Sequence, residues 1–258
     1  MEQAIRIVKR PEAAADAPPA ARQEAVALAD ECVQFGFCIS VCPTYVLTRD
    51  EDESPRGRID LIRAMLESDA PPEAATVRHV DQCLSCLSCM STCAARVDYA
   101  HLVDEARVHI EQHYRRPFAD RVMRGLVAAV VPKPARLRLA LRMARWSRPL
   151  ARFMGRRLRG MLELAPAHLP QAAEASRLQG SSLYPAQGER RLRVALLPGC
   201  AQQVLGRHIN EAAIRVLTRH GCEVVVPQAE CCGALTVHMG KAELGRRAAA
   251  QSIDALMR

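Results

Sequence analysis

Residues 83–93 read CLSCLSCMSTC and contain four cysteines in the spacing C-x2-C-x2-C-x3-C: Cys83, Cys86, Cys89 and Cys93. This spacing is typical of [4Fe–4S] ligation, because two intervening residues let one turn bring successive thiolates to neighbouring corners of a cubane. Zinc is the alternative, but it is usually bound by two C-x2-C pairs that a longer loop separates. The run therefore favours iron–sulfur chemistry.

A second cysteine group precedes the first, in the stretch ECVQFGFCISVCP at residues 31–43. An iron–sulfur run with this spacing would have a fourth cysteine at position 35, where this chain has Phe35. In two-cluster proteins the last cysteine of each run ligates the other cluster. The pairing predicts one complete set, made of Cys83, Cys86, Cys89 and Cys42, and one incomplete set, made of Cys32, Cys38 and Cys93.

Three thiolates leave the state of the second cluster open. They could hold a [3Fe–4S] cluster, or a [4Fe–4S] cluster whose open iron takes water or an exogenous ligand, or no cluster. Asp30 and Glu31 are nearby carboxylates, but nothing in the sequence places either at the missing corner.

A third group consists of Cys200 and the triplet Cys231-Cys232-Gly233. Cys200 ends one expected strand, and the triplet follows the next. Neighbouring parallel strands place such groups at one carboxyl edge of a sheet, where α/β proteins bind ligands. Buried cysteines also serve as small apolar residues, which suits Cys222 at the start of a strand. We interpret the third group as a redox or metal site, on the general expectation for clustered intracellular cysteines.

Helices are expected to position the first two cysteine groups. Helical patterns occupy residues 21–30, 59–68, 75–83 and 99–116, and the cysteines fall at their ends. We therefore expect a disordered lead-in at 1–21 and a helical, ferredoxin-like domain with two clusters at 22–118. A basic helical connector and a linker rich in Pro, Gln and Ser are expected at 119–190.

The segment 191–258 differs in character. RLRVALLPGC and CEVVVP read as short buried strands, and helical patterns follow each of them. Strand, helix, strand, helix predicts a parallel α/β unit, and two strands make only the first part of such a domain. The expected fold class is thus α+β: a helical ferredoxin-like domain, a basic helical connector and a partial α/β Cys-Cys-Gly domain.

Composition narrows the setting of the protein. Eleven cysteines without a secretory signal indicate a reducing compartment, and we expect no transmembrane helix because no long uncharged apolar stretch occurs. The net charge of +8 is local, because residues 121–162 hold twelve Lys or Arg and no Asp or Glu. The rest of the chain holds 24 basic and 28 acidic residues.

Several segments from about residue 30 to the C-terminus carry a resemblance: FGFCISVCPTYVL, SPRGRIDLI, CLSCLSCMSTC, YAHLVDEAR, LRVALLPGCAQQVL, INEAAIRVL and ECCGALTVHMG. On these the chain resembles the iron–sulfur subunit of bacterial glycolate oxidase (glycolate dehydrogenase). Similar motifs also occur in lactate-utilisation proteins, anaerobic glycerol-3-phosphate dehydrogenase subunits and heterodisulfide-reductase-like proteins. The stretch YPAQGERRLRVALLPGCAQQVL favours glycolate oxidase among them.

The resemblance implies a non-catalytic electron-transfer subunit. Flavin-containing partner subunits would oxidise glycolate to glyoxylate, and this subunit would pass electrons singly towards a membrane quinone. Two iron–sulfur clusters are the implied cofactors, and no G-x-G-x-x-G run indicates FAD binding to this chain. The implied location is the cytoplasm, or the inner face of the cytoplasmic membrane.

The chain departs from the family pattern in three places. Phe35 replaces a cluster cysteine, and Ala94 replaces the proline that usually follows Cys93. Family members also continue through the rest of the Cys-Cys-Gly domain and a second such repeat, so we expect a truncated member. Cys200, Cys231 and Cys232 would then form only part of a site.

The basic stretch RLRLALRMARWSRPLARFMGRRLRGML admits several interpretations. It could lie on anionic lipid with Trp146 and Phe153 at the interface, or dock on an acidic flavin subunit. An ordinary helical layer with solvated arginines is the plain alternative, and nucleic-acid binding is not expected. Arg56 and Arg58 could tune a cluster potential, but exposed loop arginines are commoner, and His79 has no ligand partner that the spacing reveals.

Overall fold

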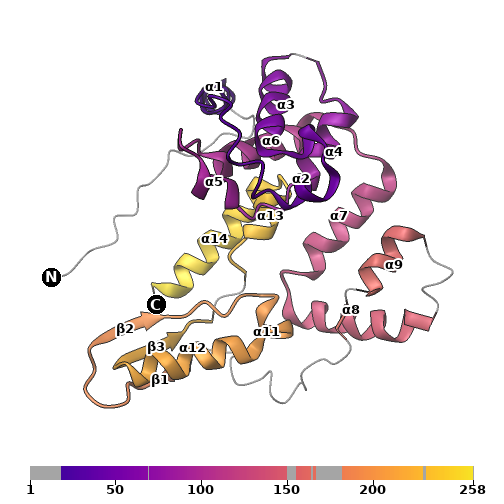
Figure 1. Ribbon diagram of the computed structural model, residues 1–258. Helices are drawn as coiled ribbons and strands as arrows, with labels where there is room; N and C mark the ends of the chain where they lie inside the picture. Colours follow the sequence, from indigo (N-terminus) through magenta and orange to yellow (C-terminus); the bar gives the residue numbers. More distant parts are fainter. Residues whose placement is uncertain are drawn as a thin grey trace. The chain divides into compact units, whose positions relative to one another are not determined.

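The computed structural model describes residues 19–68, 70–149, 155–163, 165–166, 182–228 and 231–257 (Figure 1). The described residues are mostly helical and include a small mixed sheet. The chain divides into two compact units, Met1–Arg115 with His238–Gly240 and Arg116–Val237 with Lys241–Arg258. Within the described ranges, no helix is long and apolar enough to cross a membrane.

Short helices joined by cysteine-bearing loops make up the first unit. In chain order they are α1 (Pro19–Asp30), α2 (Pro43–Thr48), the 3-10 helix η1 (Glu51–Glu53), α3 (Pro55–Glu67), α4 (Ala74–Gln82), α5 (Ser88–Thr92) and α6 (Tyr99–His113). Local chemistry sets the helix starts. Ser54 caps α3 by accepting a hydrogen bond from the Gly57 amide at 3.0 Å, and Asp98 caps α6 in the same way.

The apolar core of the first unit lies between α1, α3, α4 and α6. Ala25, Ile62, Val80, Leu102 and Ile110 are fully buried there, one or two from each of these helices. Each large apolar side chain of this kind contributes about 1.5–3 kcal/mol through its removal from water. The cysteine loops are held against this core, because Cys32, Cys38, Cys83 and Cys93 all pack on it.

The expected helices of the first unit are found with shifted ends. α1 begins at Pro19, inside the predicted lead-in, because proline is favoured in the first turn of a helix. The rest of that lead-in, residues 1–18, lies outside the described residues. α6 ends at His113 rather than residue 116, because Pro117 disfavours a helical conformation in the residue before it.

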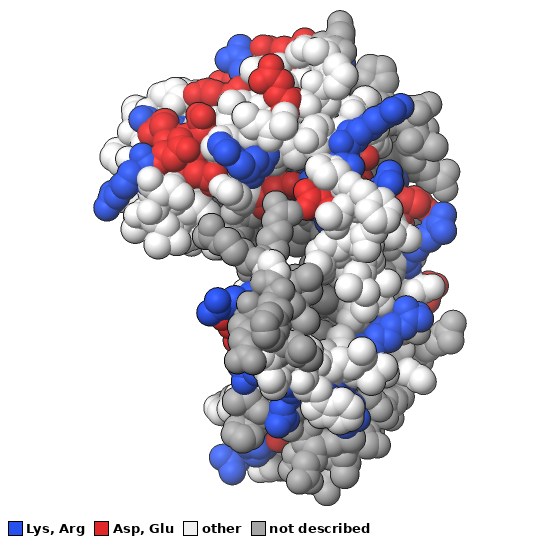
Figure 2. Space-filling view, turned by 90° about the vertical axis from the view of Figure 1, so that its right-hand side faces the viewer, with Lys and Arg blue, Asp and Glu red and all other residues white. Residues whose placement is uncertain are grey.

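The second unit begins with the basic segment. Its helices α7 (Phe118–Val130) and α8 (Pro134–Ser147) are separated at Pro132, and α9 (Arg156–Glu163) follows. The remaining elements are β1 (Ser182–Tyr184), β2 (Leu192–Ala195), α11 (Gln202–Leu205), α12 (Arg207–Arg219), β3 (Cys222–Val226), α13 (Ala234–His238) and α14 (Ala242–Leu256). On the face drawn in Figure 2, acidic side chains gather over the first unit, whereas Lys and Arg predominate over the basic segment.

The sheet has the strand order β1-β3-β2 and is mixed, not purely parallel as the sequence predicted. β2 and β3 are parallel, with Val194 opposite Val224, while β1 pairs antiparallel with β3. β1 falls in the predicted linker; three residues are too short to show an alternating pattern, and only the pairing with β3 defines the strand. Cys222 is buried in the core between β3 and α12, as expected of a small apolar residue.

Candidate iron–sulfur sites

Four of the predicted ligands line one cavity in the first unit, which we call site 1. They are Cys42, Cys83, Cys86 and Cys89. Cys42 immediately precedes α2, Cys83 follows the end of α4, and Cys89 lies in α5. Arg58, Thr44 and Tyr99 complete the polar lining. The structure therefore brings the cysteine before Pro43 to the three cysteines of the other run.

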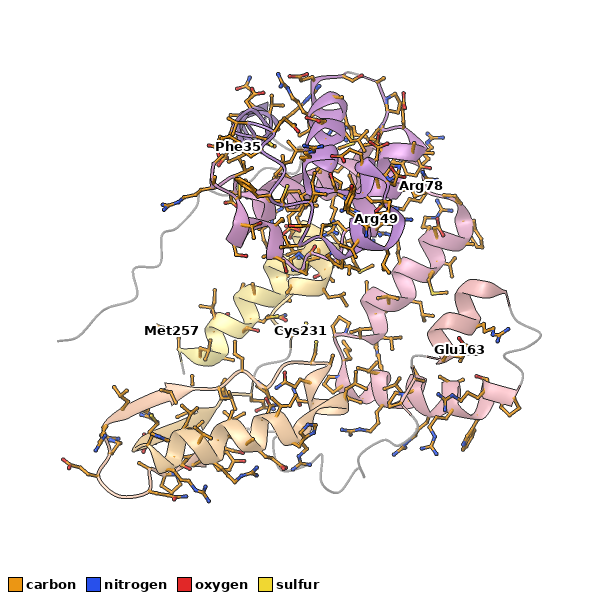
Figure 3. All side chains as sticks on the ribbon, viewed as in Figure 1. Phe35, Arg49, Arg78, Glu163, Cys231 and Met257 are labelled. Atoms are coloured by element: carbon orange, nitrogen blue, oxygen red, sulfur yellow. The ribbon has the colours of Figure 1, made fainter. Side chains whose placement is uncertain are left out.

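The remaining three predicted ligands line a separate cavity, which we call site 2. They are Cys32, Cys38 and Cys93. Phe35 and Phe37 belong to the same lining; their rings stack with centroids 6.0 Å apart. Figure 3 labels Phe35 on its loop in the first unit. The Phe35 side chain is 64% exposed, so it lies at the rim and does not fill the cavity.

The two cysteine loops share one backbone conformation, which the sequence did not reveal. In the loop of site 2, Gln34 and Gly36 have φ of 58° and 81°; in the loop of site 1, Ser85 and Leu87 have φ of 49° and 58°. These residues stand two and four positions after the first cysteine of each run. Left-handed φ is uncommon for residues other than glycine, so its repetition marks one recurring loop.

Hydrogen bonds repeat in register with these angles. Ile39 donates from its amide to Gly36 O at 3.1 Å, and Met90 donates to Leu87 O at 3.0 Å. Phe35 therefore occupies the loop position that Cys86 holds in site 1. The loop of site 2 therefore keeps the backbone of the site 1 loop and differs at this position only in its side chain.

The thiols differ in how readily they ionise. Burial is the main cause that raises the pKa of Cys89 to about 12, and nearby Cys83 adds to it. Burial likewise raises the pKa of Cys38, whereas the backbone N–H of Ser88 lowers the pKa of Cys86. Thiolates are the ligands of iron, so cluster binding must displace protons from the buried thiols.

These cavities fit a cluster by the chemistry of their donors. All eleven cysteines are free thiols. Among the described residues, no three Cys, His, Asp or Glu side chains converge closely enough to hold a single metal ion. A cubane binds each thiolate to a different iron, so its four ligands stand farther apart than four ligands of one zinc ion.

The Cys-Cys-Gly segment forms a third constellation, in the second unit, where Figure 3 labels Cys231. The Sγ atoms of Cys231 and Cys200 lie 3.7 Å apart, and Cys232 is exposed. Burial, more than the neighbouring Cys200, raises the pKa of Cys231 to about 11. The turn needs glycine at Gly233, because φ is +84° and a Cβ there would lie 2.4 Å from the Gly245 carbonyl oxygen.

The expectation of exposed loop arginines was wrong for Arg58. Both Arg56 and Arg58 lie in the first turns of α3, and Arg58 is 1% exposed beside Cys42. His79, which had no recognisable partner in the sequence, is buried against Glu53. No sequence pattern indicated these contacts, because His79 is 21 residues from Arg58 and 26 residues from Glu53 along the chain.

Two family models match the chain. The 4Fe-4S dicluster domain matches residues 3–97, and the Cysteine-rich domain matches residues 194–258. The chain is therefore an iron–sulfur protein that combines a dicluster domain with a cysteine-rich domain.

Curated relatives place the chain more narrowly. It is 37% identical over 233 residues to the glycolate oxidase iron–sulfur subunit of Escherichia coli (strain K12). The matched region is 90% of this chain and 53% of that relative. It is 32% identical over 235 residues to a probable glycolate oxidase iron–sulfur subunit of Bacillus subtilis (strain 168), covering 87% of this chain and 53% of that protein. The predicted resemblance to these subunits is confirmed.

The chain spans about half the length of these two relatives. A weaker relative is an uncharacterized iron–sulfur protein of Methanocaldococcus jannaschii, 23% identical over 226 residues, which are 83% of this chain and 37% of that protein. No solved structure matches the chain significantly.

Proposed function

We propose that this chain is an electron-transfer iron–sulfur subunit of a glycolate-oxidising complex. A flavin-containing partner subunit would oxidise glycolate to glyoxylate and release electrons to this chain, which would pass them towards a membrane quinone. The observation that carries the proposal is that seven cysteines line two cavities, and that each cavity is lined by cysteines from both runs. The names of the relatives supply the substrate.

The proposed ligands follow the two cavities. Site 1 would hold a [4Fe–4S] cluster on Cys42, Cys83, Cys86 and Cys89. Site 2 would hold a [3Fe–4S] cluster, or a [4Fe–4S] cluster with one open iron, on Cys32, Cys38 and Cys93. Cys200, Cys231 and Cys232 would contribute part of a third site. A bound cluster accepts and returns one electron at a time.

The residues of the chain itself set the conditions for that exchange. Cys42 and Cys89 are buried, so their side of site 1 is shielded from water, while Cys86 is exposed and gives an edge for electron entry or exit. Tyr99 donates a hydrogen bond from its hydroxyl to the Cys83 Sγ at 3.6 Å. Such donors to sulfur stabilise the reduced, more negative state of a cluster.

Crossed ligation can be tested with two serine variants of the anaerobically purified chain. Cys42→Ser should disturb the cluster of the Cys83 run, and Cys93→Ser should disturb the cluster of the Cys32 run, as followed by EPR of the oxidised and reduced protein. If each variant instead affects the cluster of its own run, the crossed assignment is wrong. Stoichiometric zinc without acid-labile sulfide would favour a zinc-stabilised interaction module.

The electron-transfer role needs its own test. The chain, mixed with flavin subunits of a glycolate oxidase, should show cluster reduction on addition of glycolate, monitored by the loss of visible absorbance. Reduction by lactate or glycerol-3-phosphate with their flavin subunits, but not by glycolate, would favour those related systems. Thiol–disulfide turnover by the chain alone would favour a heterodisulfide-reductase-like role.

We further propose that α8 attaches the chain peripherally to anionic lipid on the cytoplasmic side. Leu139, Met143 and Trp146 follow each other at helical spacing on one face, and Trp146 is 84% exposed. Arg136 and Arg142 stand three residues before and after Leu139, so cationic side chains flank this apolar face. Phe153, the other expected interfacial residue, lies outside the described residues.

This arrangement is typical of helices that lie in a membrane interface. Vesicles that contain phosphatidylglycerol should co-sediment the chain and blue-shift Trp146 fluorescence, whereas neutral vesicles should not. The double variant Leu139→Gln, Met143→Gln should lose this binding, while Leu192→Gln, which alters an exposed apolar residue elsewhere, should retain it. Equal binding by both variants would contradict the role of α8.

A further inference from the structure

Three ionisable side chains are buried together beside site 1. Arg58 is 1% exposed, Glu53 3% and His79 4%. They come from α3, η1 and α4. Arg58 and the Glu53 carbonyl lie against Cys42, and His79 contacts both Arg58 and Glu53. Burying charge is costly unless the charges are paired and hydrogen-bonded.

The Arg58 guanidinium is fixed by every nitrogen it has. Its Nε donates to the His79 carbonyl oxygen at 2.7 Å, and Nη1 donates to the Glu53 carbonyl oxygen at 2.5 Å. Its Nη2 donates to Thr44 Oγ1 at 3.1 Å and also forms an ion pair with the Glu53 carboxylate. With these partners in place, Nη1 lies 3.9 Å from the Cys42 Sγ and points a donor at it.

The surrounding groups hold this arrangement. Glu53 accepts a second hydrogen bond, at 2.7 Å from His79 Nδ1, so its carboxylate is shared between Arg58 and His79. Thr44 Oγ1 lies 3.2 Å from the Cys42 Sγ and 2.8 Å from the Glu53 carbonyl oxygen, to which it donates. A buried ion pair of this kind is weak evidence for stability, because apolar residues of similar volume often stabilise a fold equally well, so a role at the neighbouring site is worth testing.

We propose that Arg58 is a positioning residue that raises the reduction potential of the cluster at site 1, and that Glu53 and His79 hold it in place. The proposal rests on the ligand assignment given above for site 1. Reduction adds a negative charge to the cluster, and a fixed cation beside a ligand sulfur favours the state with more negative charge. The effect is strong because Arg58 and Cys42 are both buried, so little water lies between the guanidinium and the ligand sulfur.

Site 2 provides the internal contrast. Arg56, from the same turn of α3, lines site 2 but is about one third exposed and pairs with the exposed Glu51 at 2.5 Å. Water and salt screen such a pair, so its influence on a cluster is weak. The structure therefore places a buried ion pair with its cationic end toward a ligand sulfur at site 1, and an exposed, screened ion pair at site 2.

The test is an EPR-monitored redox titration of the full, cluster-loaded chain. Arg58→Met should lower the midpoint potential of the site 1 signal. The reduction equilibrium should change at least tenfold, which corresponds to about 59 mV for a one-electron couple. Glu53→Gln should raise that potential, because the glutamine amide oxygen can still accept from Arg58 and hold it in place while the counter-charge is lost. Arg58→Lys should fall between Arg58→Met and the unaltered chain. Arg63→Met, which alters an exposed residue of the same helix, is the matched control. It should change the reduction equilibrium less than twofold.

The potential should fall in Arg58→Lys and rise in Glu53→Gln, and these opposite shifts distinguish an electrostatic role of Arg58 from a structural one. If Arg58→Met fails to assemble the cluster, Glu53→Gln and Arg58→Lys still decide the matter. A shift of both Arg58→Lys and Glu53→Gln in the same direction, or no shift in either, would overturn the proposal. A site 1 signal that survives Cys42→Ser unchanged would instead contradict the ligand assignment, which is a distinct failure.

Discussion

Phe35 stands at the position of a cluster ligand, and replacing it with cysteine should complete site 2. The loop around Phe35 repeats the left-handed residues and hydrogen bonds of the loop around Cys86. A cysteine at position 35 therefore starts from the backbone that already presents Cys86 to site 1. The variant Phe35→Cys should convert the second signal from an open or three-iron type to a full [4Fe–4S] type.

The cost of this change to the fold should be small. Only about a third of the Phe35 side chain is buried, so its removal forfeits roughly 0.5–1 kcal/mol of apolar burial. The stacking on Phe37 adds about 0.5–1.5 kcal/mol at most, since both rings are exposed. The domain should therefore remain folded. If site 2 of the unaltered chain holds three irons, the iron count for the two clusters should rise from about seven to about eight; if it holds a [4Fe–4S] cluster with an open iron, the count should stay at about eight.

EPR of the oxidised protein gives the assay, because an oxidised [3Fe–4S] cluster is paramagnetic and an oxidised [4Fe–4S] cluster is not. If site 2 of the unaltered chain holds three irons, the oxidised signal should disappear in Phe35→Cys, and a second reduced signal should appear after dithionite. Phe37→Cys is the matched control: it alters a similarly exposed aromatic residue of the same cavity but not the repeated ligand position. Conversion by Phe37→Cys, or two full [4Fe–4S] clusters in the unaltered chain, would refute the reasoning.

Three further predictions test other parts of the structure. In the cluster-free chain, iodoacetamide should modify Cys86 well before Cys89, because the pKa of Cys86 is lowered and that of Cys89 is raised to about 12. The rate of Cys86 modification should rise with pH over a lower range than that of Cys89, and peptide mapping by mass spectrometry reads the order; equal rates would contradict the prediction. Gly57→Ala should destabilise the first unit by about 1–3 kcal/mol in urea unfolding, since the new Cβ would lie 2.2 Å from the residue 51 carbonyl oxygen; a loss under about 0.5 kcal/mol would contradict that packing. Burial, with His113 adding to it, lowers the pKa of His109 from 6.5 to about 4. The unfolded chain therefore binds a proton at His109 before the folded chain does, and the stability of the fold should decrease as the pH drops from 6.5 towards 4. His109→Gln should weaken this pH dependence in thermal melts, and an unchanged profile would contradict the prediction.

Helical periodicity and cysteine spacing are enough to locate much of the fold. Each of α1, α3, α4 and α6 falls on an expected helix, and the crossed cysteine sets line separate cavities. These features are local, or follow from a spacing rule. Long-range features could not be predicted in this way. β1 exists only through its pairing with β3, and the burial of Arg58 depends on partners from η1 and α4.

The repeated loop conformation lies between these two cases. Gln34, Ser85 and Leu87 adopt positive φ although none is glycine, so only Gly36 could indicate the turn from its residue type. The position of Phe35 could be inferred from spacing alone, but only the shared backbone shows that the loop is otherwise that of a ligand-bearing run. The closeness of Cys200 and Cys231, by contrast, was expected from parallel strands, and β2 and β3 do pair in parallel.

The most direct test of the account is the iron and acid-labile sulfide content of the anaerobically purified chain, combined with Mössbauer spectra that distinguish the cluster types. We expect one complete [4Fe–4S] cluster and a second cluster of the three-iron or open-iron type, both lost when the cysteines of their own cavity are replaced. A colourless chain that binds stoichiometric zinc and contains no sulfide would contradict the central claim that these seven cysteines bind electron-carrying clusters.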